Sequence, residues 1–511
     1  MKMNFKKIFS GAIASVMMLA MSAASFSAYA EGDDEIISDG NLEFKYIDGG
    51  VEIVGCDTSV TELNIQERLN GYSVIKIGAE AFRDCAKLKK VTLPETVKTI
   101  DSAAFMNCYS LEEINISGAI DTLGECVFWN CAMLDGVELK GELQSIPSGT
   151  FYNCQLLTGV DIPESVTYIG ASAFDNCITM EKIEIPESVT IIDANAFRNC
   201  YLIDKLNLPP GLTGIGGGAF INCYNLSEIT LAESNSVYTV ENNILYDKQK
   251  TTILTSAPLA ISGKVEIPRT VKTIQAYAFA GCTELEAIDI PASISVIDEG
   301  TFSYCSSLTE VKVPDGVKEI GVMAFSNCDK LVKVQLPATL NTIGQMAFYH
   351  NTSLESVNFM GALKSIGDGA FLDCHSLKSV TIPKNVETIG QYAFGYKSVN
   401  DGQSAVLIAD FVMNVIEGSS AEKYAKSNDV DYKAADSGLK KVVFIVICVG
   451  AVILISVIVV VIVRKDKKKP ETEAKKVEEE EPIDEEGYES ILGDGESSEN
   501  EEYIAEESED E

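Results

Sequence analysis

Residues 308–328 read LTEVKVPDGVKEIGVMAFSNC, and this stretch decides the fold. In its first half, the apolar residues Leu308, Val311 and Val313 precede Pro314. Apolar residues two apart, with polar residues between them, indicate a short half-buried strand, and proline ends it because it has no N–H to donate. The second half, V-x-x-I-G-x-x-A-F-x-x-C, has the apolar spacing of a turn and a short helix that pack back on the strand.

The same pattern recurs along the chain with a period of 23 residues. Each unit is marked by a phenylalanine, and after one break the series resumes at the same spacing. The marking residues are Phe82, Phe105, Phe128, Phe151, Phe174, Phe197, Phe220, Phe279, Phe302, Phe325, Phe348, Phe371 and Phe394. A unit this small cannot enclose a core alone, but stacked units bury a continuous one. We therefore expect a solenoid with parallel strands and a phenylalanine spine inside.

The consensus L-x-x-V-x-I-P-x-x-V-x-x-I-G-x-x-A-F-x-x-C resembles the repeat of the BspA-like leucine-rich-repeat (LRR) surface proteins, over about residues 75–396. The ends also fit, because residues 42–53 read as a hairpin with a glycine turn. Residues 419–426 are similar to the family's terminal capping helix, and Ser419 is a suitable N-cap. The resemblance implies a leucine-rich-repeat solenoid of short parallel strands with turns or short helices. It also implies a bacterial surface protein with an adhesive or other binding role.

The repeats and their one break predict the order of segments. They are an N-terminal capping hairpin region at 31–74, a first solenoid segment at 75–233, a β-hairpin island at 234–264, a second solenoid segment at 265–397, and a C-terminal cap with a short linker at 398–438. The island lies in the 59-residue gap between Phe220 and Phe279. Such excursions can bind ligands, and a purely structural insert is the alternative.

The two ends of the sequence predict export and membrane anchoring. Residues 1–30 combine a basic start, an apolar stretch and Ala-Tyr-Ala before Glu31, which is typical of a cleaved signal peptide. Residues 442–463 are 22 apolar residues without a charge, and at about 1.5 Å per residue they suffice for a transmembrane helix. The basic cluster at 464–469 places the C-terminus in the cytoplasm. We expect a single-pass protein of the cell membrane with its ectodomain outside.

The formal net charge of −36 excludes a basic nucleic-acid footprint, so we expect no nucleic-acid partner. Residues 464–511 carry 21 acidic and 7 basic residues with little apolar content, which predicts a disordered acidic cytoplasmic tail. Such a tail could contact a basic cytoplasmic partner.

Eleven of the 14 cysteines lie three residues after a repeat phenylalanine, at Cys85, Cys108, Cys131, Cys154, Cys177, Cys200, Cys223, Cys282, Cys305, Cys328 and Cys374. Neighbouring coils about 5 Å apart would not exclude pairing. Asn351 takes this position in one unit and Lys397 in another. The asparagine indicates a small inward polar group that satisfies the backbone, so we expect reduced, buried thiols. His350 and His375 stand at different repeat positions and there is no C-x-x-C pair, so no metal site is predicted.

The sequence carries no recognisable catalytic constellation. It lacks a G-x-S-x-G elbow, an H-E-x-x-H pair and a phosphate-binding loop, and it has only two histidines. We therefore expect a non-enzymatic protein without a cofactor.

One candidate ligand contact is an acidic strip. Glu138, Asp161 and Glu184 take the outward position between the two strand hydrophobics in three successive units. Like charges this close repel unless solvent or a cation separates them. An ordinary solvated face is the alternative, and a Ca²⁺ site is a third interpretation.

The second candidate contact is a row of large side chains. Met106, Trp129 and Tyr152 each follow the repeat phenylalanine in adjacent units. Aromatic side chains in a row can stack on sugars or anchor a protein partner. Packing against the neighbouring loops is the alternative. Together the two rows place a candidate contact region at residues 105–185.

Two functions compete. The first is an adhesion or interaction module for an extracellular protein or glycan. The second is an envelope-organising or receptor-like single-pass protein whose acidic tail contacts a cytoplasmic partner. About 40 residues separate Phe394 from the predicted span, and no L-P-x-T-G-like motif precedes that span. In a thick-walled cell this geometry would hold the ectodomain close to the membrane, which favours the second function.

Overall fold

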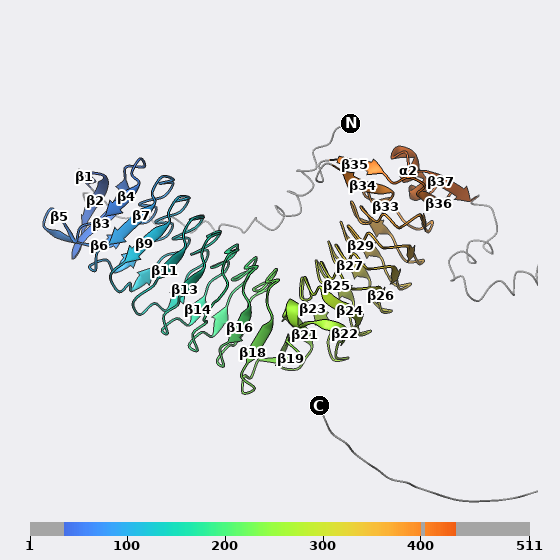
Figure 1. Ribbon diagram of the computed structural model, residues 1–511, viewed down its shortest axis with the longest axis horizontal. Helices are drawn as coiled ribbons and strands as arrows, with labels where there is room; N and C mark the ends of the chain where they lie inside the picture. Colours follow the sequence, from blue (N-terminus) through green and yellow to red (C-terminus); the bar gives the residue numbers. More distant parts are fainter. Residues whose placement is uncertain (1–34, 400–403, 436–511) are drawn as a thin grey trace, which may run out of the picture. The chain divides into compact units, whose positions relative to one another are not determined.

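The computed structural model describes residues 35–399 and 404–435. The predicted signal peptide, membrane span and acidic tail lie outside the described residues. Within the two described ranges, no helix is long and apolar enough to span a bilayer. The described residues form a solenoid in which each 23-residue unit makes one coil (Figure 1).

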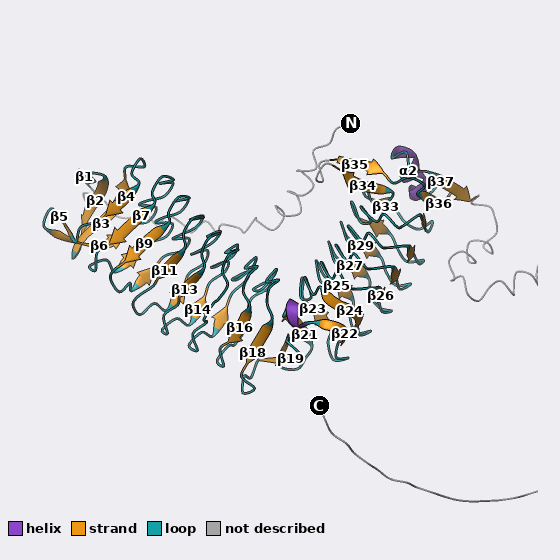
Figure 2. Ribbon diagram, viewed as in Figure 1, coloured by secondary structure: helices purple, strands orange, loops and turns teal. Residues whose placement is uncertain are grey.

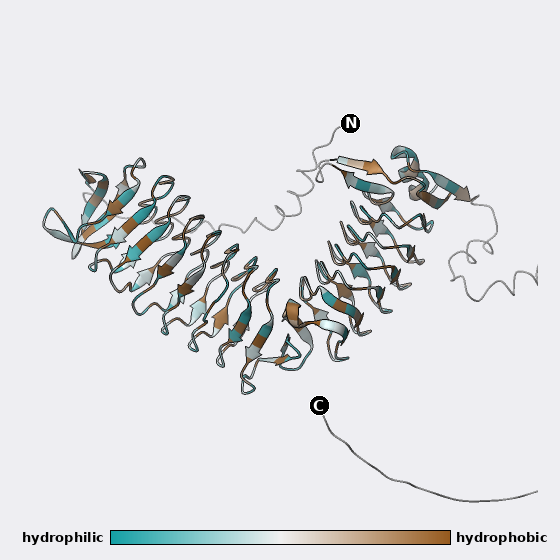
Figure 3. Ribbon diagram, viewed as in Figure 1, coloured by the Kyte–Doolittle hydropathy of each residue, from teal (hydrophilic) through white to brown (hydrophobic). Residues whose placement is uncertain are grey.

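The L-x-x-V-x-I half of most coils supplies a strand of the first ladder, although the coil that contains Ile183 forms no strand there. Neighbouring strands of this ladder pair in parallel, so that Val311 lies opposite Val334, and Val334 opposite Val357. The members are β4 (Glu62–Asn64), β7 (Lys90–Leu93), β9 (Glu113–Ile116), β11 (Gly136–Glu138), β13 (Gly159–Asp161), β16 (Lys205–Leu208), β18 (Glu228–Leu231), β22 (Ser262–Glu266), β24 (Glu284–Asp289), β26 (Glu310–Lys312), β28 (Lys333–Gln335), β30 (Ser356–Asn358) and β32 (Ser379–Thr381). Most of their inward residues are buried, and hydrophobic and hydrophilic residues alternate along the strands (Figure 3).

The V-x-x-I half supplies a second ladder of two-residue strands, which the sequence pattern did not predict. These strands also pair in parallel, as Ile297 does with Ile320. The members are β6 (Tyr72–Ile77, longer than the rest), β8 (Thr99–Ile100), β10 (Thr122–Leu123), β12 (Ser145–Ile146), β14 (Tyr168–Ile169), β15 (Ile191–Ile192), β17 (Gly214–Ile215), β23 (Thr273–Ile274), β25 (Val296–Ile297), β27 (Glu319–Ile320), β29 (Thr342–Ile343), β31 (Ser365–Ile366) and β33 (Thr388–Ile389).

The short helix expected around each phenylalanine is wrong, because this section of the coil is a series of turns (Figure 2). Two residues per coil have left-handed backbone, as at Ala103 (φ 57°) and Asn107 (φ 62°), and such residues cannot continue a right-handed helix. Alternate N–H groups bond to the next coil, as Ala103 N does to Glu125 O at 2.8 Å and Phe105 N to Val127 O at 2.9 Å. Hydrogen bonds between coils therefore replace those of a helix.

The predicted phenylalanine spine is present. All thirteen rings are buried, and neighbouring rings stack with centroids 4.9–5.8 Å apart and planes within 16° of parallel. The column has seven rings from Phe82 to Phe220 and six from Phe279 to Phe394. Burial of each ring stabilises the fold by roughly 1.5–3 kcal/mol.

The N-terminal end is covered by antiparallel strands. They are β1 (Ile37–Asp39), β2 (Leu42–Ile47), β3 (Gly50–Cys56) and β5 (Arg68–Leu69). β2 pairs with β3, and β3 pairs in parallel with β6, so the hairpin continues into the second ladder.

Residues 234–264 depart from the coil pattern with β19 (Tyr238–Glu241), β20 (Ile244–Asp247), β21 (Thr252–Ser256) and the 3₁₀ turn η1 (Pro258–Ala260). β19–β20 and β20–β21 are antiparallel pairs, and β21 then pairs in parallel with β23. The chain thus returns to the second ladder in register. Buried Asn235 holds the entry, because its amide donates to Leu212 O at 2.9 Å and its oxygen accepts from Tyr238 N at 2.8 Å.

The C-terminal end is covered by β34 (Tyr396–Val399), β35 (Ser404–Leu407), β36 (Val412–Ile416), α2 (Ser420–Ser427) and β37 (Tyr432–Ala435). The hydroxyl of Ser419 accepts from Glu422 N at 3.2 Å and so caps α2. The hydroxyl of buried Tyr424 accepts from Phe394 N at 3.0 Å and donates to Phe394 O at 3.1 Å. One side chain therefore bonds both main-chain polar groups of Phe394, the last of the repeat phenylalanines.

Candidate functional site: two hollows on the first ladder

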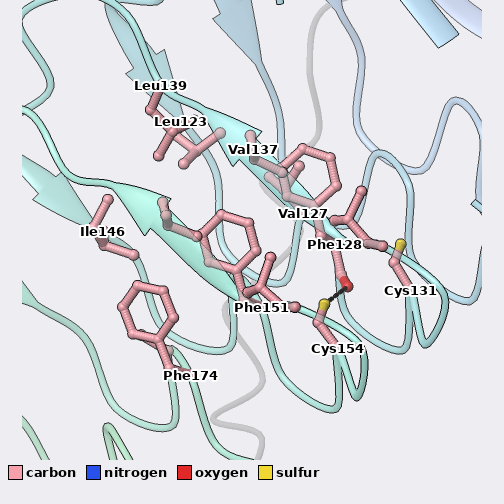
Figure 4. Packing of buried hydrophobic residues seen from close by; sticks show 14 of the residues in the cluster. Leu123, Val127, Phe128, Cys131, Val137, Leu139, Ile146, Phe151, Cys154 and Phe174 are labelled. Carbon is pink, nitrogen blue, oxygen red and sulfur yellow. Dashed lines mark hydrogen bonds between the residues drawn. The ribbon is translucent and has the colours of Figure 1, made fainter. Parts of the chain in front are cut away.

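The cysteines at the repeat position are structural. Nine of them donate a hydrogen bond to the carbonyl of the phenylalanine one coil earlier, at 3.1–3.3 Å. Figure 4 shows one such bond, from Cys154 Sγ to Phe128 O. Burial raises the pKa of these thiols, to about 12 at Cys223, so the thiolate is disfavoured. No disulfide joins two of the cysteines that the structure describes.

Asn351 shows why an amide can replace a thiol at this position. Its Nδ2 donates to Phe325 O at 3.0 Å, as the cysteines do, and its Oδ1 accepts from Cys328 N at 2.8 Å. The inference of a small inward polar group that satisfies the backbone agrees with this geometry.

A second side-chain ladder was not predicted from the sequence. The residue two after the repeat phenylalanine has left-handed backbone and is asparagine in seven coils, because asparagine tolerates this conformation better than most residues. Asn130 Nδ2 donates to Asn107 Oδ1 at 2.8 Å, and Asn153 Nδ2 to Asn130 Oδ1 at 2.9 Å. The 23-residue recurrence of asparagine was a visible signal.

The first hollow lies on the outward face of the first ladder, between β11 and the coil after β13. It has a volume of about 540 Å³, and its floor includes Gly136 and Gly159. The same position carries Glu113 in the coil before and Lys182 in the coil after. Two successive glycines therefore remove two side chains from a row that is otherwise filled, and the hollow forms in their place.

The second hollow adjoins the first and shares Gly136 and Thr158 with it. Its volume is about 680 Å³, and Met133 and Leu156 line one side. These two apolar side chains are 44% and 42% exposed, which makes an apolar edge on an otherwise polar face. The hollows together offer a contact strip across several coils.

The predicted acidic strip lines the first hollow. Glu138 lies opposite Asp161 in the parallel pairing of β11 with β13, and Glu184 lines the hollow from the next coil. All three carboxylates are exposed. Glu138 pairs with Lys140 at 3.1 Å, whereas Asp161 and Glu184 form no ion pair within the stretch of chain that the structure describes. Their charge is thus available to a ligand.

The predicted aromatic row lies elsewhere on the coil and lines neither hollow. Met106, Trp129 and Tyr152 are half-buried, and the rings of Trp129 and Tyr152 stack with centroids 3.7 Å apart. A Cβ added to Gly149 would lie 2.8 Å from the Trp129 ring, so that ring also covers the neighbouring turn. The two candidate rows are therefore separate, and ligand contact by either remains a prediction.

The aromatic row continues into a buried ion pair. Asp175 follows the next repeat phenylalanine and is buried, and Arg198 one coil further donates to its carboxylate at 2.6 Å. Burial raises the pKa of Asp175, although Arg198 beside it favours the charged form. The carboxylate of this pair is buried, whereas the Arg198 side chain is partly exposed.

Both histidines of the chain lie close to the same carboxylate. The sequence did not predict this, because the two histidines stand at different positions of the repeat. His350 Nδ1 lies 3.6 Å and His375 Nε2 3.5 Å from the carboxylate of buried Asp373. Asp373 also accepts from Ser398 N at 2.6 Å and so holds β34 to the coil. Within residues 35–399 and 404–435, no group of three or more His, Cys, Asp or Glu side chains could hold a metal ion.

The stacked coils, two parallel ladders and phenylalanine column define the class of leucine-rich-repeat solenoid proteins. The sequence profile of the BspA type leucine rich repeat region matches residues 56–179, 144–260 and 272–400, which is more than half of the chain. The chain belongs to this family.

The chain is also similar to solved structures. A leucine rich cell surface protein of Faecalibacterium prausnitzii is 26% identical, with a TM-score of 0.56 over 66% of this chain and 95% of that one. A leucine-rich repeat protein of Bacteroides ovatus is also 26% identical, with a TM-score of 0.45 over 78% of this chain and 99% of that one. No curated protein sequence gives a significant match.

Proposed function

We propose that the chain is a membrane-anchored, non-catalytic surface protein whose first ladder binds an extended segment of a protein partner. The observation that carries the proposal is the pair of adjoining hollows over Gly136 and Gly159. A ladder of uniform coils would present a filled row of side chains, whereas this one is open across neighbouring coils. An extended chain needs such a strip, because its contacts repeat along its length.

The charge of the strip favours a cationic segment. Five carboxylates and one amine, Lys182, line the first hollow, and three carboxylates and no amine line the second. Lys89 and Lys90 neutralise two of the latter, Glu112 and Glu113, at 2.8 and 2.7 Å. The remaining negative potential attracts Lys or Arg side chains and disfavours other anions.

The apolar edge favours a protein over a neutral glycan. Met133 and Leu156 are flexible apolar side chains beside carboxylates, and an amphipathic peptide presents the complementary pair of groups. Sugar recognition more often uses an exposed aromatic face, and neither hollow has an aromatic lining residue. A glycan is therefore the second ligand class, with Trp129 and Tyr152 as its candidate contacts.

The test is an array experiment with the full-length chain in detergent. The probes are peptides that combine Lys or Arg with apolar residues, acidic peptides of matched length, and neutral glycans. We expect binding to the basic peptides, weakening as salt screens the charges. The triple variant Glu138→Gln, Asp161→Asn, Glu184→Gln should bind roughly tenfold or more weakly.

The matched control is Glu286→Gln, Glu319→Gln, Glu355→Gln, which removes the same charge from exposed positions outside both hollows. This control variant should bind the basic peptides like the wild type if the carboxylates of the acidic strip, and not the net charge of the protein, attract the ligand. Unchanged basic-peptide binding by the first triple variant, or binding to glycans alone, would overturn the assignment of the strip.

Exposure at the cell surface separates adhesion from the alternative role in envelope organisation. Antibodies against the ectodomain should label intact cells if the partner is external. Labelling that appears only after wall removal would instead support an envelope-organising or receptor-like protein whose acidic tail contacts a cytoplasmic partner.

A further inference from the structure

We infer that Cys56 and Cys85 are a disulfide-forming pair that locks the N-terminal cap onto the first coil. Cys56 ends β3 in the capping hairpin and lies outside the repeat, whereas Cys85 takes the repeat cysteine position of the first coil. Their sulfur atoms are 3.0 Å apart. A disulfide bond measures about 2.05 Å, so an approach of about 1 Å would join them.

Cys85 differs from the later repeat cysteines in its partner. Nine later thiols donate to the carbonyl of the phenylalanine one coil earlier, as Cys108 does to Phe82 O at 3.1 Å. Cys282, which follows the excursion, contacts the hydroxyl of Ser256 at 3.5 Å instead. No marking phenylalanine precedes Phe82, so Cys85 has no such carbonyl. The thiol of Cys85 instead contacts the sulfur of Cys56. The repeat cysteine of the first coil therefore has a sulfur partner, whereas Cys108 in the next coil has a carbonyl oxygen.

Access and acidity also set this pair apart. Cys56 is partly exposed, whereas Cys108 and Cys131 are buried. The hydrogen bond from Cys56 lowers the pKa of Cys85 despite burial, while burial raises the pKa of Cys131. The pair thus combines a thiol that an oxidant can reach with a neighbour that readily becomes a thiolate.

The oxidant required is a small or protein disulfide. Cys56 is the accessible thiol, and its proton passes to the neighbouring Cys85 thiolate as its sulfur attacks one sulfur of that disulfide and releases one thiolate. The thiolate of Cys85 then attacks the Cys56 sulfur and releases the second, and the two protons lost by the cysteines convert both leaving groups to thiols. The cysteine pair is oxidised by two electrons and the external disulfide is reduced by two. The export proposed above would expose the chain to such oxidants.

The bond would act at one end of the stack. The capping hairpin has a neighbouring coil on one side only, so opening of the solenoid from this end should begin there. A bond between Cys56 and Cys85, 29 residues apart, would hold the hairpin on the first coil and restrict the opened chain.

The test uses the full-length chain purified without reductant and incubated with glutathione disulfide. After alkylation and digestion, mass spectrometry should find the Cys56 and Cys85 peptides joined and lighter by two hydrogen atoms than their sum. Hydrogen exchange of amides in β2 and β3 should be roughly tenfold slower than in the reduced chain. Alkylation of both residues as free thiols in the folded, oxidant-treated chain would overturn the inference.

Two variants make the assignment specific. Cys56→Ser should lose the linked peptide and the effect of reductant on exchange, whereas Cys108→Ser, which changes the next repeat cysteine, should keep both. A linked peptide that joins Cys85 to Cys108 in the wild type would contradict the pairing without need of any variant.

Discussion

The buried thiol of Cys154 is a hydrogen-bond donor for the carbonyl of Phe128, at 3.1 Å. Cys154→Val keeps a small apolar side chain and removes this donor, so the carbonyl keeps only its bond from Cys131 N at 3.0 Å. We expect a loss of about 0.5–1.5 kcal/mol in the free energy of unfolding. Urea unfolding followed by fluorescence of Trp129, the only tryptophan, measures it in the same region of the solenoid.

Cys154→Ser is the control for this prediction, because its hydroxyl still donates. The serine variant should lose less free energy of unfolding than the valine variant, even though serine is the more polar residue. If valine proved as stable as serine, the thiols would be space-filling groups and their hydrogen bonds would contribute little.

At the scale of single elements, Asp247 holds the turn between β20 and β21. Its carboxylate accepts from Thr251 N at 2.6 Å and from Thr252 N at 3.0 Å, and Thr251 Oγ1 donates to it as well. Burial alone would raise the pKa of Asp247, but these hydrogen bonds outweigh it and the pKa is lowered from 3.8. The carboxylate binds its proton less readily in the folded chain than in the unfolded one.

The sign of the pH dependence follows. The stabilisation by Asp247 is fully present above its unfolded pKa and is lost as pH falls through the lower folded value. Asp247→Asn should therefore be less stable than the wild type at about pH 6, and the difference should shrink towards about pH 3. Hydrogen exchange of β20 and β21 amides checks this. Thr251→Val, which keeps both backbone donors, should show a weaker form of the same effect.

The period and spine of the solenoid could be read from the sequence, because both depend on residues that recur every 23 positions. The conformation around each phenylalanine could not. Alanine at a position such as Ala103 favours a helix locally, yet it has left-handed backbone there. Hydrogen bonds to the next coil override that preference, and a pattern of side chains does not reveal main-chain partners between coils.

The candidate site was predictable to a limited extent. The carboxylates of Glu138, Asp161 and Glu184 could be placed in one row by register alone. The hollow beside them was not predicted. It could have been found only by comparing Gly136 and Gly159 with the residues at the same repeat position in the other coils, which have side chains there. The Cys56–Cys85 contact could not be read from register at all, because Cys56 lies outside the repeat.

On the scale of the whole molecule, the coils bury two clusters of apolar side chains. One runs from the N-terminal cap to the excursion at 234–264, and the other from there to the C-terminal cap. Because a coil contacts mainly its neighbours, stability should be transmitted over short distances along the stack.

Two matched substitutions test this locality. Phe151→Ala, next to Trp129 in the first cluster, should lower the unfolding midpoint reported by Trp129 and cost about 3–5 kcal/mol. Phe325→Ala removes the same ring from the second cluster and should leave that midpoint much less changed, while exchange protection falls around residues 302–348. Equal shifts of the Trp129 midpoint would show that the two clusters unfold as one unit.

The equal length of the coils has a mechanical consequence. If tension between the ends detached coils one at a time, each would release 23 residues, which extend to about 80 Å at roughly 3.3–3.6 Å per residue. The molecule would lengthen in steps of nearly constant size and would absorb a pull in small increments. A protein that holds a partner under flow or shear would thereby yield gradually and keep its remaining coils folded.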